Sequence, residues 1–181
     1  MQGTGHRFPL PRKHGFLKPR ARRGDDGQQD WRSERRGEMT IATILQGRQP
    51  GGVVTLHPDA TVADAVALLA ERRIGAVPVL DNDQVVGIFS ERDVIHCLQA
   101  HGASALAQSV RDVMTAAVKS IAPGESVIGA LSLMTQRRIR HLPVIEGGRL
   151  VGFVSIGDLV KYRIDRIEAD AAAMRAYIQS A

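Results

Sequence analysis

The chain has 181 residues, of which 44% are hydrophobic, and this length fits one globular domain with additional ends. Its single cysteine, Cys97, excludes an intramolecular disulfide and a zinc site built from several cysteines. No hydrophobic stretch is long enough to span a bilayer or to form the core of a secretory signal. We therefore expect a soluble protein of the cytoplasm that has no membrane partner.

The formal net charge of +5 comes from residues 1–38. This segment holds ten Lys and Arg against five Asp and Glu, whereas residues 39–181 hold fourteen of each. A basic chain ordinarily suggests a nucleic-acid partner. Because the folded part is neutral, the charge does not support one here, and nucleic acid is not an expected partner of that part.

Residues 1–38 contain Pro, Gly and Arg throughout and show no apolar periodicity, which is typical of a disordered segment. The first interpretation is a disordered basic leader, or a start assigned too early with Met39 as the true first residue. A basic arm that touches RNA or another anionic surface is a second interpretation. An organellar transit peptide is a third, although the acidic residues in this segment argue against it.

Residues 39–53 predict a short lead-in helix and then a linker, because the apolar residues stop at a Pro-Gly-Gly sequence. The chain then repeats itself. Residues 54–95 recur at 119–160 without a gap, and thirteen of the aligned positions are identical. A duplicated unit this small cannot bury its own apolar faces. Two copies that complete each other's core predict a pseudo-two-fold module with equivalent clefts between the halves, which favours ligand binding.

Each copy predicts the same order of elements: short strand, helix, strand, strand, helix. Thr61 and Ser126 precede the first helix, where apolar residues recur at helical spacing. The short apolar runs AVPVL and HLPVI predict strands, and the turns DND and EGG join each of them to a second strand. Ser90 and Ser155 then begin the last helix. The fold class is therefore α/β, with two β-α-β-β-α repeats in one module.

The remaining segments are a connector and a C-terminal extension. We assign residues 54–100 and 118–163 to the two repeats, and residues 101–117 to the connector between them. Residues 164–181 continue the last helix, and an apolar face along it makes this extension amphipathic. That face consists of Val160, Ile164, Ile167, Ala171 and Met174. We expect it to pack either on a second subunit or on the module's own surface.

Both copies also share a sequence motif, in which an apolar residue and Pro-Val precede a turn, followed by V-G-[IF]-x-S-x-x-D. In this the chain resembles a tandem pair of CBS domains, also called a Bateman module, over about residues 40–165. The segments IRHLPVI and VSIGD and the terminal AYIQ are similar to the corresponding sequences of stand-alone bacterial CBS-pair proteins and of their plant organellar relatives. The resemblance implies a regulatory adenosine ligand, such as AMP, ADP, ATP, NAD(H) or S-adenosylmethionine. It also implies a homodimer of modules.

The residues fit such a ligand. Ser90 begins a helix whose N-terminus attracts phosphate, Arg92 offers a guanidinium for phosphate oxygens, and Asp93 suits ribose hydroxyls. In the second copy, an isoleucine and a glycine lie between Ser155 and Asp158, in place of Glu91 and Arg92 of the first copy. That cleft has lost its local cation, and we expect the two sites to be unequal.

The resemblance extends the candidate nucleotide-binding set to both copies. Gly75 and Ala76 leave room for adenine, whereas the second copy has a cation and a histidine at these positions. The full set is Thr55, Gly75, Ala76, Pro78, Ser90, Arg92, Asp93, Ser120, Arg140, His141, Pro143, Ser155 and Asp158. The pattern S-x-x-D is also a plain helix-capping box, and this structural interpretation stays open beside the functional one.

The sequence contains no phosphate-binding loop, no cluster at metal-ligand spacing and no nucleophile with a placed base. We therefore expect a protein that is not an enzyme and has no catalytic cofactor or metal. The predicted function is a sensor, in which a nucleotide bound between the halves shifts the equilibrium of a dimer or of an unknown regulated protein. The alternative is an interaction scaffold with empty clefts, which contacts nucleic acid through the basic N-terminal arm.

Overall fold

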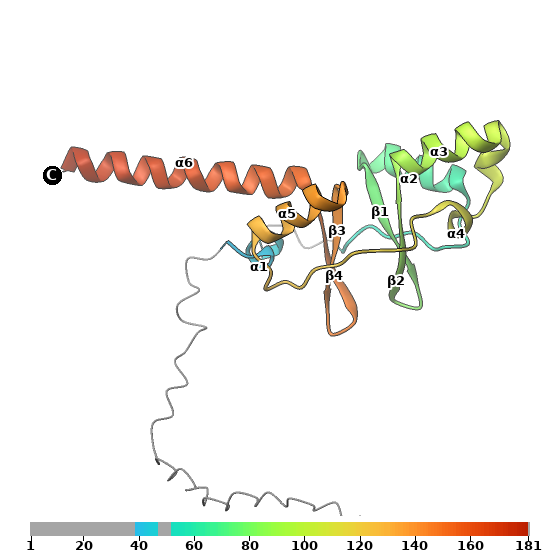
Figure 1. Ribbon diagram of the computed structural model, residues 1–181, viewed down its shortest axis with the longest axis horizontal. Helices are drawn as coiled ribbons and strands as arrows, with labels where there is room; N and C mark the ends of the chain where they lie inside the picture. Colours follow the sequence, from blue (N-terminus) through green and yellow to red (C-terminus); the bar gives the residue numbers. More distant parts are fainter. Residues whose placement is uncertain (1–38, 47–51, 181) are drawn as a thin grey trace, which may run out of the picture. The chain divides into compact units, whose positions relative to one another are not determined.

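The computed structural model describes residues 39–46 and 52–180 (Figure 1). The sequence interpretations of residues 1–38 lie outside the described residues. The helices and strands, in chain order, are α1 (Ile41–Gln46), α2 (Val62–Arg72), β1 (Ala76–Asp81), β2 (Gln84–Ser90), α3 (Glu91–His101), the 3₁₀ helix η2 (Gly102–Ala107), α4 (Val110–Val113), α5 (Val127–Arg137), β3 (His141–Glu146), β4 (Arg149–Ser155) and α6 (Ile156–Ser180). The mixed α/β fold predicted from the sequence, including the C-terminal helix, is confirmed.

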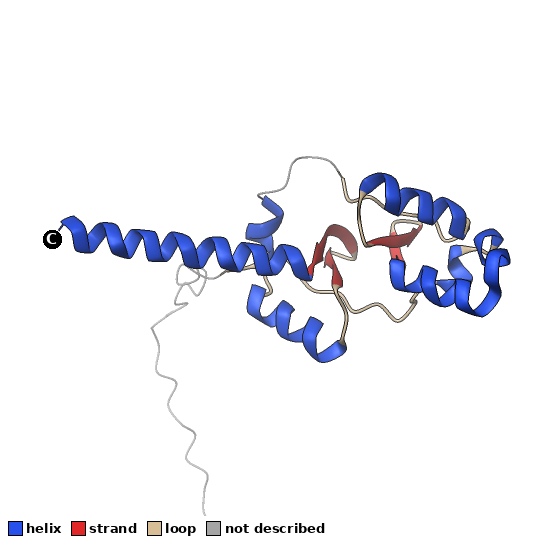
Figure 2. Cartoon of the chain, turned by 90° about the horizontal axis from the view of Figure 1, so that it is seen from above, coloured by secondary structure: helices blue, strands red, loops and turns tan. Residues whose placement is uncertain are grey.

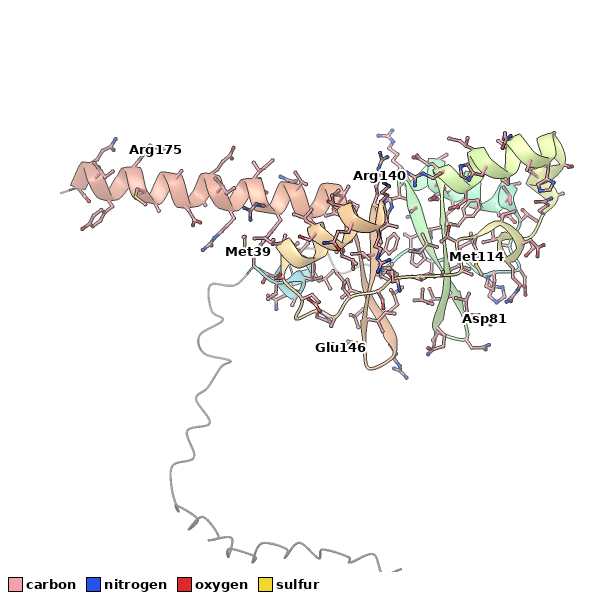
Figure 3. The ribbon with its side chains drawn as sticks, in the orientation of Figure 1. Met39, Asp81, Met114, Arg140, Glu146 and Arg175 are labelled. Atoms are coloured by element: carbon pink, nitrogen blue, oxygen red, sulfur yellow. The ribbon has the colours of Figure 1, made fainter. Side chains whose placement is uncertain are left out.

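Each half contains one antiparallel hairpin, β1–β2 or β3–β4, closed by a two-residue turn. Asn82 and Asp83 have positive φ angles of 47° and 64°, and Gly147 and Gly148 have 56° and 80°. Two successive residues of positive φ form the turn whose twist matches a hairpin. Asp81 and Glu146 mark the two tips (Figure 3). The DND and EGG turns are therefore confirmed.

The first strand of each predicted repeat is reduced to a single bridging residue. The Leu56 N–H donates to the Pro78 carbonyl (3.0 Å), and the Leu80 N–H donates to the Leu56 carbonyl (2.9 Å). Ile121 bridges β3 in the same parallel manner. Pro58, two residues after Leu56, has no N–H to donate, and this limits the pairing.

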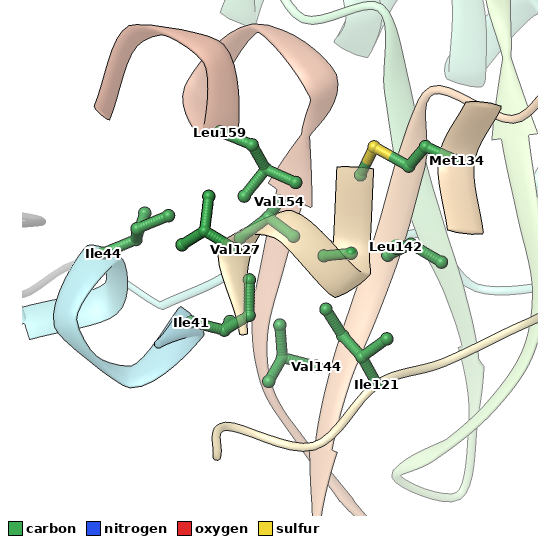
Figure 4. Packing of buried hydrophobic residues seen from close by; sticks show 10 residues of the cluster. Ile41, Ile44, Ile121, Val127, Met134, Leu142, Val144, Val154 and Leu159 are labelled. Atoms are coloured by element: carbon green, nitrogen blue, oxygen red, sulfur yellow. The ribbon is translucent and has the colours of Figure 1, made fainter. Parts of the chain in front are cut away.

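The two hairpins lie next to one another, with β2 against β4, and the helices of each half lie outside them (Figures 1 and 2). Each half has its own apolar core. The first contains Val62, Ala65, Leu69, Val77, Val79, Phe89, Cys97, Ala105 and Val110. The second contains Ile41, Ile44, Ile121, Val127, Ala130, Met134, Leu142, Val144, Val154 and Leu159 (Figure 4).

The segments before each repeat exchange partners. Ile41 of α1 precedes the first repeat, but its side chain is fully buried in the second core, and its N–H donates to the Glu125 carbonyl (2.9 Å). Val110 of α4 precedes the second repeat but packs in the first core, and its N–H donates to the Ala60 carbonyl (2.9 Å). Each lead-in helix thus completes the core of the other half, which joins the halves into one module.

Two strand glycines make this exchange possible. A Cβ on Gly152 would lie 2.6 Å from Leu45 Cδ2, just after Ile44 of α1. A Cβ on Gly87 would overlap the side chain of Met114, whose Cγ lies 2.9 Å away. Figure 3 shows Met114 beside β2. A glycine inside a strand often allows another segment to approach closely, and the contacts of Gly87 and Gly152 assign both glycines to packing.

Helix α6 is attached to the second core only through its first two turns. Leu159 is fully buried there, and Ile156 and Tyr162 pack beside it. From Ile164 to Ser180, every residue is exposed. Among the helices of the described ranges, none is long and apolar enough to cross a membrane.

Candidate functional site

A pocket of about 200 Å³ lies between the two halves. The first half contributes the junction between β2 and α3, the second half contributes the start of β3, and the connector closes one side. The lining residues are Gly75, Ile88, Ser90, Glu91, Arg92, Asp93, Thr115, Ala117, Val118, Lys119, Ile139, Arg140 and His141. Because both halves line it, a molecule bound there would contact both copies of the repeat.

The junction between β2 and α3 is fixed by its own hydrogen bonds. The Ser90 N–H and hydroxyl both donate to Asp93 Oδ2, at 2.8 and 2.6 Å. The Thr115 hydroxyl donates to Asp93 Oδ1 at 3.2 Å. The Asp93 carboxylate is thus oriented through both oxygens at the N-terminus of α3. The helix-capping interpretation of S-x-x-D is confirmed in geometry, and its carboxylate still borders the pocket.

The connector reaches the pocket because it pairs with the outer edge of β2. The Ile88 N–H donates to the Thr115 carbonyl, the Thr115 N–H donates to the Ile88 carbonyl, and both distances are 3.0 Å. This bridge places Thr115 beside Asp93 and leads the chain past the junction through Val118 and Lys119. The path of the connector thereby brings the ammonium group of Lys119, in the second repeat, to the lining.

The charges of the lining come from three separate segments. Arg92 belongs to α3, Lys119 is the first residue of the repeated sequence in the second half, and Arg140 directly precedes β3. The carboxylates of Glu91 and Asp93 lie on the same wall as Arg92. Figure 3 shows Arg140 at the end of β3 that faces the first half. Three cations from different segments around one pocket suit a phosphate group.

His141 adds a half-buried imidazole to the lining. Its ring stacks on Phe153, with centroids 5.5 Å apart and planes 6° apart. Burial lowers the pKa of His141, the carboxylates of Asp158 and Glu91 act against this effect, and Arg140 lowers the pKa further. The neutral imidazole therefore predominates at neutral pH, where it can both donate and accept a hydrogen bond.

The pocket brings together six of the thirteen candidate residues. These are Gly75, Ser90, Arg92, Asp93, Arg140 and His141. The lining does not include Thr55, Ala76, Pro78, Ser120, Pro143, Ser155 or Asp158. Of these, Ala76, Pro78 and Pro143 are buried within strands. Their role in ligand binding stays a prediction.

The equivalent junction of the second half repeats the cap. The Ser155 N–H and hydroxyl both donate to Asp158 Oδ2 at 2.7 Å, and the Asp158 N–H donates to the Ser155 hydroxyl at 3.2 Å. The segment between α1 and the first repeat, which takes the place of the end of the connector, includes residues 47–51, and these lie outside the described residues. The expected difference between the two clefts therefore stays a prediction.

Sequence reasoning missed seven lining residues. Glu91 was identified only as a position that differs between the copies, and Ile88 and Ile139 only as apolar members of the repeat. The other four are Thr115, Ala117, Val118 and Lys119, which belong to the connector or to the first position of the second repeat. A gap-free repeat compares only the positions inside its two copies, so it gives no signal for a connector.

Comparison with known proteins gives one consistent result. The family model described as "CBS domain" matches residues 51–100 and 110–165. A relative from Arabidopsis thaliana, "CBS domain-containing protein CBSX3, mitochondrial", is 32% identical over 148 residues, which are 77% of this chain and 72% of the relative. The solved structure of the CBS-domain containing protein ATU1752 from Agrobacterium tumefaciens is 40% identical with a TM-score of 0.66, and the match covers 71% of this chain and 96% of that one.

The chain is also similar to a protein whose structure was solved with AMP and to part of an enzyme. The crystal structure of CBSX2 in complex with AMP is 26% identical, with a TM-score of 0.60 over 70% of this chain and 97% of that one. The inosine-5'-monophosphate dehydrogenase of Mycobacterium tuberculosis is 34% identical over 132 residues, 71% of this chain but only 24% of that enzyme. The similarity thus covers a minor part of the enzyme.

Proposed function

The chain belongs to the CBS domain family, with two CBS domains in tandem, and we propose that it is a non-catalytic regulatory module that binds an adenosine nucleotide between its halves. The observation that carries this proposal is the pocket at the β2–α3 junction, which is lined from both halves and carries cations from three segments. The AMP bound by CBSX2, a member of similar fold, supports this ligand class.

The lining divides into a polar part and an apolar part. Arg92, Lys119 and Arg140 suit the phosphate, together with the N-terminus of α3. Ile88, Val118 and Ile139 offer apolar surface for a base, and Asp93 can accept hydrogen bonds from ribose hydroxyls. The small volume of about 200 Å³ favours a mononucleotide such as AMP over a dinucleotide such as NAD.

Occupancy of this pocket gives a means of regulation. A ligand that contacts α3 on one side and β3 on the other favours the arrangement of the halves in which both contacts form. The change would be transmitted to a regulated protein or to a homodimer of modules. Ile95 on α3 and Ile128 on α5 are 65% and 51% exposed, and these apolar positions support contact between modules through their helices. We propose the cytoplasm as the location.

Thermal unfolding of the full chain, stripped of nucleotide, tests the proposal. AMP, ADP, ATP, NAD, NADH and S-adenosylmethionine are each added. A ligand at about a hundred times its dissociation constant adds about 2.7 kcal/mol, which corresponds to several degrees for a domain of this size. We expect AMP or another mononucleotide to raise the melting temperature most.

The pseudo-two-fold symmetry provides a matched control. Asp93→Ala and Asp158→Ala remove the same capping bonds from equivalent junctions, and loss of such a cap costs about 0.5–2 kcal/mol. Asp93→Ala also removes the bond from the Thr115 hydroxyl, so the melting temperature of each variant without ligand is the reference for its own shift. Only Asp93 lines the described pocket. The ligand-induced shift should disappear in Asp93→Ala and persist in Asp158→Ala. No shift with any ligand, or equal loss in both variants, would remove the pocket as the sensor and favour a scaffold that acts by contact alone.

A further inference from the structure

The C-terminal part of α6, from Ile167 to Ser180, has no counterpart in the first half. Helix α3 ends at His101, where Gly102 follows with a φ of 58°. Glycine with positive φ is a common helix terminator. The repeat aligns Gly102 with Ile167, where α6 continues as far as Ser180. This projecting part lies free of the rest of the described chain (Figures 1 and 3).

Six of the exposed apolar residues of α6 follow a heptad. They are Val160, Ile164, Ile167, Ala171, Met174 and Ile178, with intervals of four and three residues in alternation. The five large ones are between 43% and 68% exposed. Apolar residues at this spacing form the a and d positions of a two-stranded coiled coil. Isolated helical segments of this length are marginal in water, so the projecting part needs a partner for this stripe.

The charged residues beside the stripe identify that partner. On the assignment that places Ile164 at a and Ile167 at d, Arg163 and Asp170 occupy g positions, and Glu168 and Arg175 occupy e positions. In a parallel, in-register pair, g faces e of the next heptad of the other helix. Arg163 then faces Glu168 of the second copy, and Asp170 faces Arg175 of the second copy. Both pairs are oppositely charged, and symmetry forms each of them twice.

Other arrangements fit the charges less well. An antiparallel pair that overlaps from Val160 to Ile178 brings Glu168 towards Glu168 and Asp170 towards Asp170 of the other copy, and like charges at these positions oppose pairing. An antiparallel pair that overlaps only from Ile167 to Ile178 brings Glu168 towards Arg175 but provides no opposite charge of the other copy for Arg163 or Asp170, so the parallel pair forms more oppositely charged contacts. A membrane surface is disfavoured because the polar face alternates basic with acidic residues. Helices that lie on membranes are rich in Lys and Arg there. The pairs Lys161–Asp165 (3.1 Å) and Arg166–Asp170 (3.4 Å) within the helix illustrate the mixed charge.

We infer that α6, from Val160 to Ile178, pairs with the same helix of a second copy as a parallel, in-register coiled coil. This contact uses a surface different from the nucleotide pocket and from α3 and α5. It tethers two modules side by side through their C-terminal helices. The inference does not depend on nucleotide binding.

Disulfide trapping in the full chain tests the register. Met174 lies at a d position, where the two copies of one residue meet across a parallel interface, whereas Ala172 lies at the outward b position. Under mild oxidation, Met174→Cys should form a disulfide-linked dimer and Ala172→Cys should not, because a disulfide needs Cα atoms about 4.4–6.8 Å apart. The native Cys97 is 5% exposed and serves as the background in both. Equal trapping of both variants, or none in Met174→Cys, overturns the inference.

A charge exchange tests the orientation independently. Glu168→Arg places like charges at both symmetric g–e contacts and should weaken dimerisation roughly tenfold in sedimentation analysis over a wide range of concentration. Adding Arg163→Glu restores opposite charges and should recover the association. Both side chains of this test are exposed or half-exposed in the monomer, so the melting temperature of each variant checks the fold. A dimer that ignores Glu168→Arg, or a double variant without recovery, contradicts a parallel coiled coil.

Discussion

The two strand–helix junctions of the module have the same backbone design and different surfaces. Ser90 and Asp93 in the first half, and Ser155 and Asp158 in the second, form matching bonds of 2.6–2.8 Å. The residues between them differ. In the first half they are exposed charges that line the pocket, whereas Ile156 of the second half packs on its own core. The two junctions thus share their capping residues, and the two positions between these residues give the junctions different surfaces.

The largest expected loss of stability comes from a substitution that tests the exchange of lead-in helices between the halves. Ile41 is fully buried in the second core although it precedes the first repeat. Ile41→Ala should therefore lower the free energy of unfolding by about 2–5 kcal/mol, measured by urea denaturation of the full chain.

The control for this prediction is Ile95→Ala, at a side chain that is 65% exposed, where a change within about 0.5 kcal/mol is expected. Equal, small effects of the two substitutions would show that α1 does not complete the second core in solution. In that case the halves would be joined only through their hairpins and the connector.

The next largest loss of stability is expected from substitutions at the two strand glycines, and it should differ between them. A Cβ at position 152 meets both branches of Leu45 at 2.6 and 2.7 Å, whereas a Cβ at position 87 meets the linear, more flexible Met114. We expect Gly152→Ala to cost about 1–3 kcal/mol, with Gly87→Ala at the lower end of this range. Gly124→Ala, which meets nothing within 4 Å, is the control in the same denaturation experiment. A larger cost at Gly87 than at Gly152 contradicts this packing.

These contacts show what the sequence could predict and what it could not. The helix starts at Thr61 and Ser126 and the turns at Asn82 and Gly147 depend on a few neighbouring residues, so local patterns predicted them. The exchange of α1 and α4 depends on the path of the chain through the whole module. Neither segment belongs to the gap-free repeat, so the repeat gave no sign of their partners.

The same distinction applies to the site. The sequence predicted the residues of the first junction and the cation and histidine opposite it, because the repeat compares these positions directly. Thr115 and Lys119 reach the pocket only because the connector pairs with the edge of β2 at Ile88. That pairing is a tertiary contact between segments that α3, η2 and α4 separate in the chain, and no pattern within the connector indicates it.

A smaller effect is expected on the affinity for AMP, and it tests the chemical difference between the two strand–helix junctions. Arg92 lines the pocket, and the repeat aligns it with Gly157. Because a hydrogen bond to a charged group contributes about 1.5–3 kcal/mol, Arg92→Ala should weaken binding of AMP by about ten- to a hundredfold in calorimetry. Adenosine, which has no phosphate, should lose little affinity.

Arg72→Ala is the matched control for that measurement, since Arg72 is also an exposed arginine on a helix but lies outside the lining. Equal losses for AMP and adenosine would show that Arg92 does not contact the phosphate. Equal losses in the two arginine variants would mean that general charge, rather than this pocket, determines affinity.

The smallest effect is a pH dependence from His141, a position that the repeat aligns with the buried, non-titrating Ala76 of the first half. Burial is the main cause that lowers the pKa of His141 below 6.5 in the folded protein. The unfolded chain therefore binds a proton more readily than the folded one. The stability from the neutral imidazole is present above pH 6.5 and is lost as the pH falls towards the pKa of the folded state.

The melting temperature should fall by a few degrees at most on acidification through this range, and His141→Asn should reduce that fall. His57→Asn, at an exposed histidine, should not. If both variants retain the full dependence, other groups cause it, and the halves do not differ in their response to pH through this residue.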